Sequence, residues 1–215
     1  MRIILEKEEI SKVIDILNQL YPNLDKSFLD FTTPFELLVA TILSAQCTDV
    51  RVNKVTKYMF KIANKAEDFA NMNIKDIEDL IKTCGLYKNK AKNIKNASIM
   101  LLREFDGKVP DTMEDLIKLP GVGRKTANVV MANAFNKDTI AVDTHVQRVS
   151  NRIGLANSKN VLNTEKDLMK NLPKDRWSIL HHQIIAHGRK ICKARNPLCH
   201  ECDIRVLCEY YKEKK

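Results

Sequence analysis

Four cysteines close to the end of the printed sequence have the residue type and spacing of a metal site. Cys192, Cys199, Cys202 and Cys208 follow the pattern C-x6-C-x2-C-x5-C. Four thiols this close together are seldom needed for packing, and thiolates bind soft metal centres such as zinc or a four-iron cluster. Only one pair has the C-x2-C knuckle typical of zinc sites, and the run differs from ferredoxin runs. The spacing therefore leaves zinc and iron–sulfur open.

A second motif, LPGVGRKTA at 119–127, places two glycines between helical patterns. Gly121 and Gly123 allow a tight turn with unusual dihedral angles and a close backbone approach. The amides of the following helix then point outward at its positive end, which suits a phosphate group. Such a contact would position DNA without reading its sequence. A plain corner between two helices is the alternative, and the basic Arg124 beside it favours phosphate.

Lys125 lies just inside the helix that follows the glycines. An amine must be deprotonated to act as a nucleophile. The positive helix end and Arg124 both disfavour the charged ammonium form of Lys125 and so favour that state. A surface lysine that binds phosphate is the alternative. Asp143 comes later, at the expected start of another helix, where it can act as an N-cap and remain ionised.

The segments that carry these residues have the three- and four-residue apolar spacing of amphipathic helices. Thr33 and Pro34 begin a helix, Glu36 can complete its capping box, and the apolar residues that follow predict a central buried helix. Residues 139–142 are the only extended-looking piece. We therefore expect an all-α fold, with helices over 7–20, from 34, 49–63, 73–81, 88–105, 112–119, 124–135, 143–153, 164–172 and 173–191.

Composition limits the classes of function. The chain has 215 residues and a formal net charge of +9, which favours a polyanionic partner such as nucleic acid. We recognise neither a targeting segment nor a membrane span, and we expect a cytoplasmic, nucleoid-associated protein that binds no membrane and acts as a monomer. Because that compartment is reducing, the six cysteines should be thiols or ligands.

These motifs together resemble the endonuclease III family of helix-hairpin-helix DNA repair glycosylases. The resemblance extends from about residue 28 to 210 and includes LSAQCTD at 43–49, GLY at 85–87 and VDTH at 142–145. It implies that Lys125 is the nucleophile that forms a Schiff base with the sugar C1′, and that Asp143 assists. It also implies that Gln46 and Leu86 fill the gap left by a flipped base. His145 would line the lesion pocket or the DNA groove.

At the cysteine run the same resemblance favours a [4Fe-4S] cluster. Lys193 and Arg195 lie in the first gap, so the clamped loop would present positive charge to a phosphate backbone. Cys47 and Cys84 are expected to be core thiols. His181 and His182 are expected to be packing or surface residues.

The resemblance implies a fold of two helical lobes with a DNA-binding cleft between them. One would be a six-helix barrel over 27–137 with the hairpin, and the other would join 1–26 to 138–215 with the cluster loop. The implied activity is removal of oxidised or ring-saturated pyrimidines from duplex DNA, followed by strand cleavage at abasic sites. Two alternatives are an adenine-mispair glycosylase, which typically lacks the lysine and carries a further C-terminal domain, and a non-catalytic DNA-binding module with a structural metal.

Overall fold

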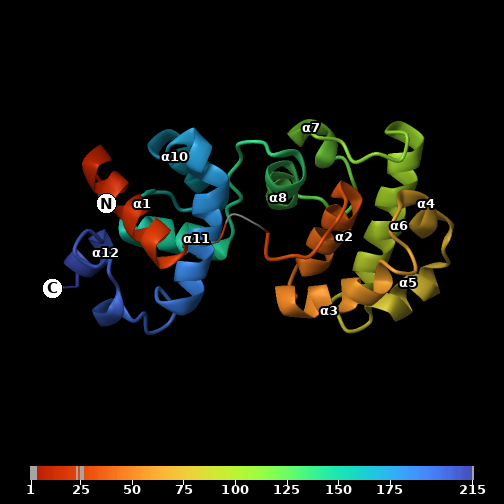
Figure 1. Cartoon of the computed structure of the whole chain (residues 1–215), viewed down its shortest axis with the longest axis horizontal. Coiled ribbons are helices and arrows are strands. Elements are labelled where there is room, and N and C mark those ends of the chain that lie inside the picture. The colour runs from red at the N-terminus through yellow and green to blue at the C-terminus, as the bar shows by residue number, and fades with distance from the viewer. Residues whose placement is uncertain (1–3, 23, 25–26, 215) are drawn as a thin grey trace. The chain divides into compact units, whose positions relative to one another are not determined.

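The computed structural model describes residues 4–22, 24 and 27–214, and this part of the chain is helical with no strand (Figure 1). The all-α prediction is confirmed. Residues 139–142 form an extended connection rather than a strand, with Ile140 to Val142 buried. No helix of the described residues is long and apolar enough to cross a membrane.

Contacts divide the chain into two compact units, Ser27–Lys137 and Met1–Lys26 with Asp138–Lys215. The described part of the first unit holds α2 (Pro34–Ser44), α3 (Asp49–Met59), α4 (Ala66–Asn71), α5 (Ile74–Ile81), α6 (Tyr87–Glu104), α7 (Met113–Leu116) and α8 (Arg124–Phe135). The second holds α1 (Lys7–Leu20), α9 (Thr144–Ile153), α10 (Val161–Asn171), α11 (Trp177–Lys190) and α12 (Glu209–Lys212), with 3₁₀ turns at Lys174–Arg176 and Cys199–Glu201.

The core of Ser27–Lys137 forms around α2. Every residue from Phe35 to Leu43 is buried, and α2 packs against α3, α6 and α8. A side chain such as Leu38 contributes roughly 1.5–3 kcal/mol by complete burial. The prediction of a central buried helix is confirmed, and the helix holds the turn after it in place.

The capping box predicted for α2 is half wrong. Thr33 does cap, since its side chain accepts from the Glu36 amide at 3.2 Å. The Glu36 carboxylate, however, accepts from the Thr32 amide at 2.6 Å and from its hydroxyl at 2.7 Å. Thr32 offers two donors to a buried carboxylate, whereas the Thr33 amide would offer one.

Some predicted helix bounds also differ from the structure, since the helices predicted over 112–119 and 164–172 are Met113–Leu116 and Val161–Asn171. The helix predicted over 49–63 ends at Met59, and α4 follows as a helix that the sequence pattern did not reveal. With 6 residues, α4 is too short for a periodic pattern, and only Ala66 and Phe69 are buried from it. Both segments pack in the same core as α2.

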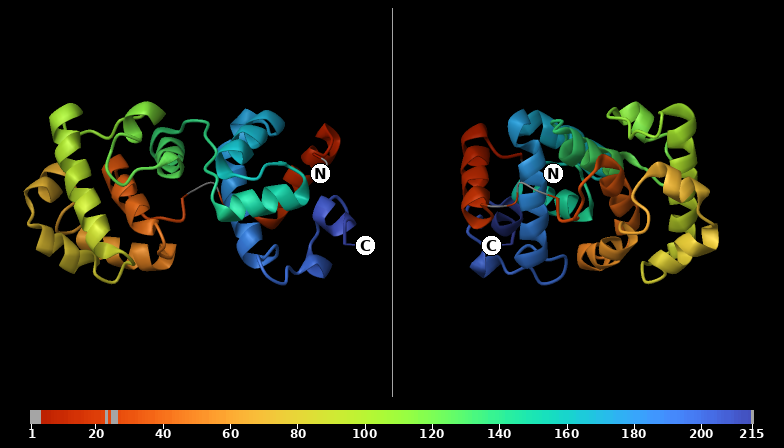
Figure 2. Two further views of the ribbon diagram at one scale, coloured as in Figure 1. Left: turned by 180° about the vertical axis from the view of Figure 1, so that it is seen from behind. Right: turned by 45° about the vertical axis from the view of Figure 1, so that its right-hand side comes forward.

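In the other unit, α11 is the central element. It packs against α1 and α9, and α9 in turn packs against α10 and α12, as the views of Figure 2 show. Ten of the 14 residues of α11 are buried, including His181, His182 and His187. The adjacent pair His181 and His182 therefore consists of packing residues, as expected.

Candidate functional site

The glycine turn joins α7 to α8 and has the strained geometry that the sequence predicts. Gly121 has φ +81°, where a side chain is rarely accommodated. A Cβ at this position would also stand 2.9 Å from Asn93 Cβ of α6. Gly123 differs, because a Cβ there would meet no atom within 4 Å. The first glycine is therefore required by the fold, whereas the second lies in open space.

Lys125 is the second residue of α8 and is exposed. Gly123 is the N-cap of this helix and Arg124 its first residue, so the backbone amides of the first turn and two basic side chains lie together. The first four amides of a helix have no partner within the helix, and they carry its positive end. This corner can bind an anion and can present an amine beside it.

Asp143 is the N-cap of α9. Its Oδ1 accepts from the His145 amide at 2.8 Å and from the Val146 amide at 2.9 Å. The carboxylate is half-buried and is held in position by these two backbone donors. His145 lies in the same turn, and its Nδ1 is 3.2 Å from a guanidinium nitrogen of Arg148.

Gln46 and Leu86 lie in two turns that touch. Gln46 follows α2 and Leu86 is the N-cap of α6, and both have left-handed backbones, with φ 53° and 59°. A Cβ on Gly85 would stand 3.2 Å from the Gln46 carbonyl oxygen. Leu86 is 56% exposed, and its left-handed backbone is uncommon for a residue other than glycine. Such strain persists only where the surrounding structure imposes it, and it often marks functional positions.

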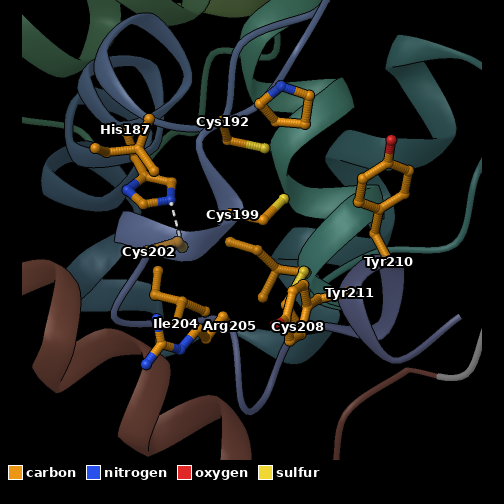
Figure 3. A pocket seen from close by; sticks show the side chains of 12 residues that line it. His187, Cys192, Cys199, Cys202, Ile204, Arg205, Cys208, Tyr210 and Tyr211 are labelled. Carbon is orange, nitrogen blue, oxygen red and sulfur yellow. Dashed lines mark hydrogen bonds between the residues drawn. The ribbon is translucent and has the colours of Figure 1, made fainter. Parts of the chain in front are cut away.

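The four cysteines of the run line one pocket, shown in Figure 3. Its remaining lining residues are Ile153, His187, Ile191, Pro197, Ile204, Arg205, Tyr210 and Tyr211. His187 Nε2 lies 3.5 Å from Cys202 Sγ. Among the residues that the structure describes, no group of three or more His, Cys, Asp or Glu side chains is arranged to hold a metal ion.

Burial affects the protonation of this pocket. It raises the pKa of Cys202 to about 11, with the other cysteines contributing in the same direction. Burial also raises the pKa of Cys208 above its usual range. Burial therefore favours the protonated thiol at both positions, and a metal centre would have to displace these protons.

Two arginines of α9 hold the loop between the first two cysteines, and sequence reasoning missed them. Arg152 donates to the carbonyls of Lys193 at 2.7 Å and Ala194 at 3.0 Å. Arg148 donates to the Cys192 carbonyl at 3.1 Å. The four-residue spacing of these two arginines, about one helical turn, was the sequence signal that could have placed them on one face of α9. Lys193 and Arg195 remain exposed on the loop that these contacts hold.

The structure thus brings together some of the predicted residues within each unit. Gln46 and Leu86 share one surface in Ser27–Lys137, and that unit also carries Lys125. In the other unit, α9 connects Asp143 and His145 to the cysteine loop through its arginines.

The comparison with protein families matches residues 39–174 to the HhH-GPD superfamily of base excision DNA repair proteins. The chain belongs to this family. It is 46% identical to endonuclease III of Bacillus subtilis over 95% of this chain and 93% of that one. Its identity to endonuclease III of Synechocystis is 49%, over 94% and 93% of the two chains.

Solved structures give the same assignment. A trapped covalent intermediate of endonuclease III with DNA has a TM-score of 0.92 and 45% identity, covering 98% of this chain and 99% of that one. A non-covalent endonuclease III–DNA complex matches equally well. A thermostable thymine-DNA glycosylase at 24% identity shares the fold, with a TM-score of 0.87. The chain is thus an enzyme of the endonuclease III kind, a DNA glycosylase with abasic-site lyase activity.

Proposed function

We propose that this enzyme removes oxidised or ring-saturated pyrimidines from duplex DNA and cleaves the strand through a Schiff base on Lys125. The observation that carries the proposal is the position of this amine. Lys125 is exposed in the first turn of α8, beside an anion-binding corner, in a chain closely similar to an endonuclease III that has been trapped covalently on DNA.

The reaction needs an amine at the sugar and a phosphate anchor beside it. The lone pair of Lys125 Nζ bonds to C1′ while the C1′–base bond breaks. The base leaves with the electron pair of the broken bond and gains a proton, and the new C1′ amine loses one. Opening of the sugar then gives the Schiff base. Loss of a proton from C2′ expels the 3′ phosphate, which is β-elimination. The amides at Gly121 and Gly123 and the Arg124 guanidinium would hold the neighbouring backbone.

Asp143 supports this chemistry as a carboxylate held at a fixed position. Two amides of α9 donate to its Oδ1 and set its direction. It would stabilise the positive charge that develops on the sugar as the base leaves, and would assist proton transfer at the nucleophile. His145 would line the lesion pocket or groove.

The touching turns would fill the gap that a flipped nucleotide leaves. Leu86 is an exposed apolar side chain that can enter a base stack, and Gln46 offers polar groups to the orphaned partner base. Lys193 and Arg195 would contact the phosphate backbone from the cysteine loop. An adenine-mispair enzyme is the second candidate by family, but the presence of Lys125 favours the lyase.

Borohydride trapping tests the proposed nucleophile. The native protein, incubated with a duplex containing an abasic site and sodium borohydride, should form a covalent adduct with DNA. Lys125→Ala should form none, while Lys166→Ala, at an exposed lysine of α10, should trap like the native protein. Failure of the native protein to trap would overturn the Schiff base mechanism.

We further infer that Cys192, Cys199, Cys202 and Cys208 hold a [4Fe-4S] cluster rather than zinc. A single zinc ion bonds each sulfur at about 2.3 Å, so its ligands must converge on one point. A cluster of eight atoms needs ligands set further apart. All four cysteines line one pocket, and the family resemblance of their C-x6-C-x2-C-x5-C spacing favours the larger group. His187 and Arg152, close to Cys202 and Cys192, could donate to the ligand sulfurs.

The cofactor is identified by colour and metal content. Purified protein should be brown and contain about four iron atoms per chain, as a [4Fe-4S] cluster requires. Cys202→Ser should lose both the colour and the iron. Cys84→Ala, at a buried cysteine of the other unit, should keep them. Colourless protein with one zinc per chain would contradict the assignment.

A further inference from the structure

Two other cysteines form a pair at the base of the gap-filling turns. Cys47 follows Gln46, and Cys84 lies two residues before Leu86. Both are free thiols, and the Cys47 thiol lies within hydrogen-bonding reach of Cys84. The backbones are also close, since the Gln46 carbonyl is in near contact with Gly85. A core position was expected for both cysteines, yet only Cys84 is buried, at 1% exposure, and Cys47 is partly open.

A buried lysine lies against this pair. Lys90 of α6 is 4% exposed, and its Nζ donates to the Leu43 carbonyl at 2.8 Å. Burial lowers the pKa of Lys90, while Cys47 and Cys84 oppose that shift, so both sulfurs lie close to its charge.

The sulfurs of Cys47 and Cys84 differ in how easily a small oxidant can reach them. Burial, followed by the proximity of Cys47, raises the pKa of Cys84 to about 11, although Lys90 and Arg51 act in the opposite direction. Cys84 therefore stays a protonated thiol within the core. Cys47 can be reached by a small oxidant, with Cys84 directly behind it. An accessible thiol with a second thiol in reach is the arrangement of a redox-responsive pair.

We propose that Cys47 and Cys84 form a reversible disulfide when the enzyme meets a peroxide. The Cys47 thiolate attacks one oxygen of hydrogen peroxide, the O–O bond breaks, and the departing hydroxide gains a proton and leaves as water. The Cys84 sulfur then bonds to the Cys47 sulfenic sulfur and expels a second water. In sum, two thiols lose two electrons and two protons, and one peroxide becomes two waters. A dithiol reductant reverses the bond.

The disulfide would act on the residues that enter DNA. It would draw the sulfurs to about 2.05 Å and tether the two turns by a covalent bond. Gln46 and Leu86 already have left-handed backbones, so their positions depend on the surrounding structure. We expect the oxidised form to bind damaged DNA more weakly, a consequence that rests on the proposed gap-filling role of these two residues.

The bond itself is tested by peptide mapping. Holoprotein treated with hydrogen peroxide, alkylated and digested without reductant should yield a peptide that joins Cys47 to Cys84 and disappears on reduction with dithiothreitol. Cys47→Ser and Cys84→Ala should lack it. If peroxide leaves Cys47 as a free thiol or carries it to sulfonic acid with no joined peptide, the proposal is overturned.

The consequence is tested by affinity for a duplex with a tetrahydrofuran abasic analogue. Peroxide should raise the Kd of the native protein severalfold, and dithiothreitol should restore it. Cys47→Ser cannot form the Cys47–Cys84 disulfide but keeps all four cysteines of the run. Any peroxide-induced loss of affinity that it shares with the native protein therefore arises at another site. Equal losses in both proteins, or no change despite a mapped disulfide, would overturn the regulatory role. Lack of binding by the untreated protein would instead overturn the proposed function.

Discussion

At the scale of single residues, Asp143 combines two roles that one carboxylate can fill. Its two hydrogen bonds from α9 amides start the helix and also fix the direction of the carboxylate that would act on the sugar. Sequence alone predicted both roles but could not separate them. Substitution separates them, because asparagine caps a helix about as well as aspartate but carries no charge.

We predict that Asp143→Asn folds with nearly native stability but forms the borohydride-trapped adduct at least about 100-fold more slowly, as expected for a lost acid–base and electrostatic group. Asp143→Ala should be equally slow and also lose about 1 kcal/mol of unfolding free energy with its cap. Denaturant unfolding and trapping rates measure the two effects. A native trapping rate in Asp143→Asn would leave Asp143 as a helix cap only.

At the scale of elements, the hairpin between α7 and α8 shows two glycines with different duties. Gly121 is required by its positive φ and by Asn93, which fills the space a side chain would need. Gly123 has φ −96° and ψ 177°, which other residues adopt readily, and open space beside it. Open space at a helix N-terminus is what a bound phosphate would occupy.

Gly121→Ala should therefore destabilise the protein by at least about 1–2 kcal/mol, the cost of a left-handed alanine before the clash with Asn93 is added. Gly123→Ala, at an N-cap position where alanine is less favourable than glycine, should lower the unfolding free energy by no more than about 1 kcal/mol. It should nevertheless weaken binding to abasic duplex, because the added methyl group occupies the phosphate position. Unfolding curves and Kd values of the two variants provide the check, and native affinity in Gly123→Ala would contradict the phosphate role.

At the scale of the whole molecule, the net charge of +9 favours DNA binding by release of counterions. Charge alone does not say which basic side chains touch phosphate. Arg124 lies at the positive N-terminal end of α8. Arg103 lies in the last turn of α6, where it is exposed and paired with Glu104. Each substitution to alanine lowers the net charge by one, so the two form a matched pair.

The salt dependence of binding should distinguish them. A plot of log K against log salt should be linear, and Arg124→Ala should reduce the magnitude of its slope by about 1, the value for one lost phosphate contact. Arg103→Ala should keep the native slope. If both variants reduce the slope equally, net charge accounts for the effect and Arg124 makes no phosphate contact.

The amino-acid sequence by itself determined the helical class, the hairpin, the cap at Asp143 and the spacing of the cysteine run, because each depends on residues within a few turns of one another. Only the tertiary structure revealed the contact between the turns of Gln46 and Gly85, the hold of Arg152 on the cysteine loop and the pairing of Cys47 with Cys84. These contacts join residues 37 to 42 positions apart. No local pattern encodes them, because packing against shared cores, such as that around α2, decides which distant turns meet.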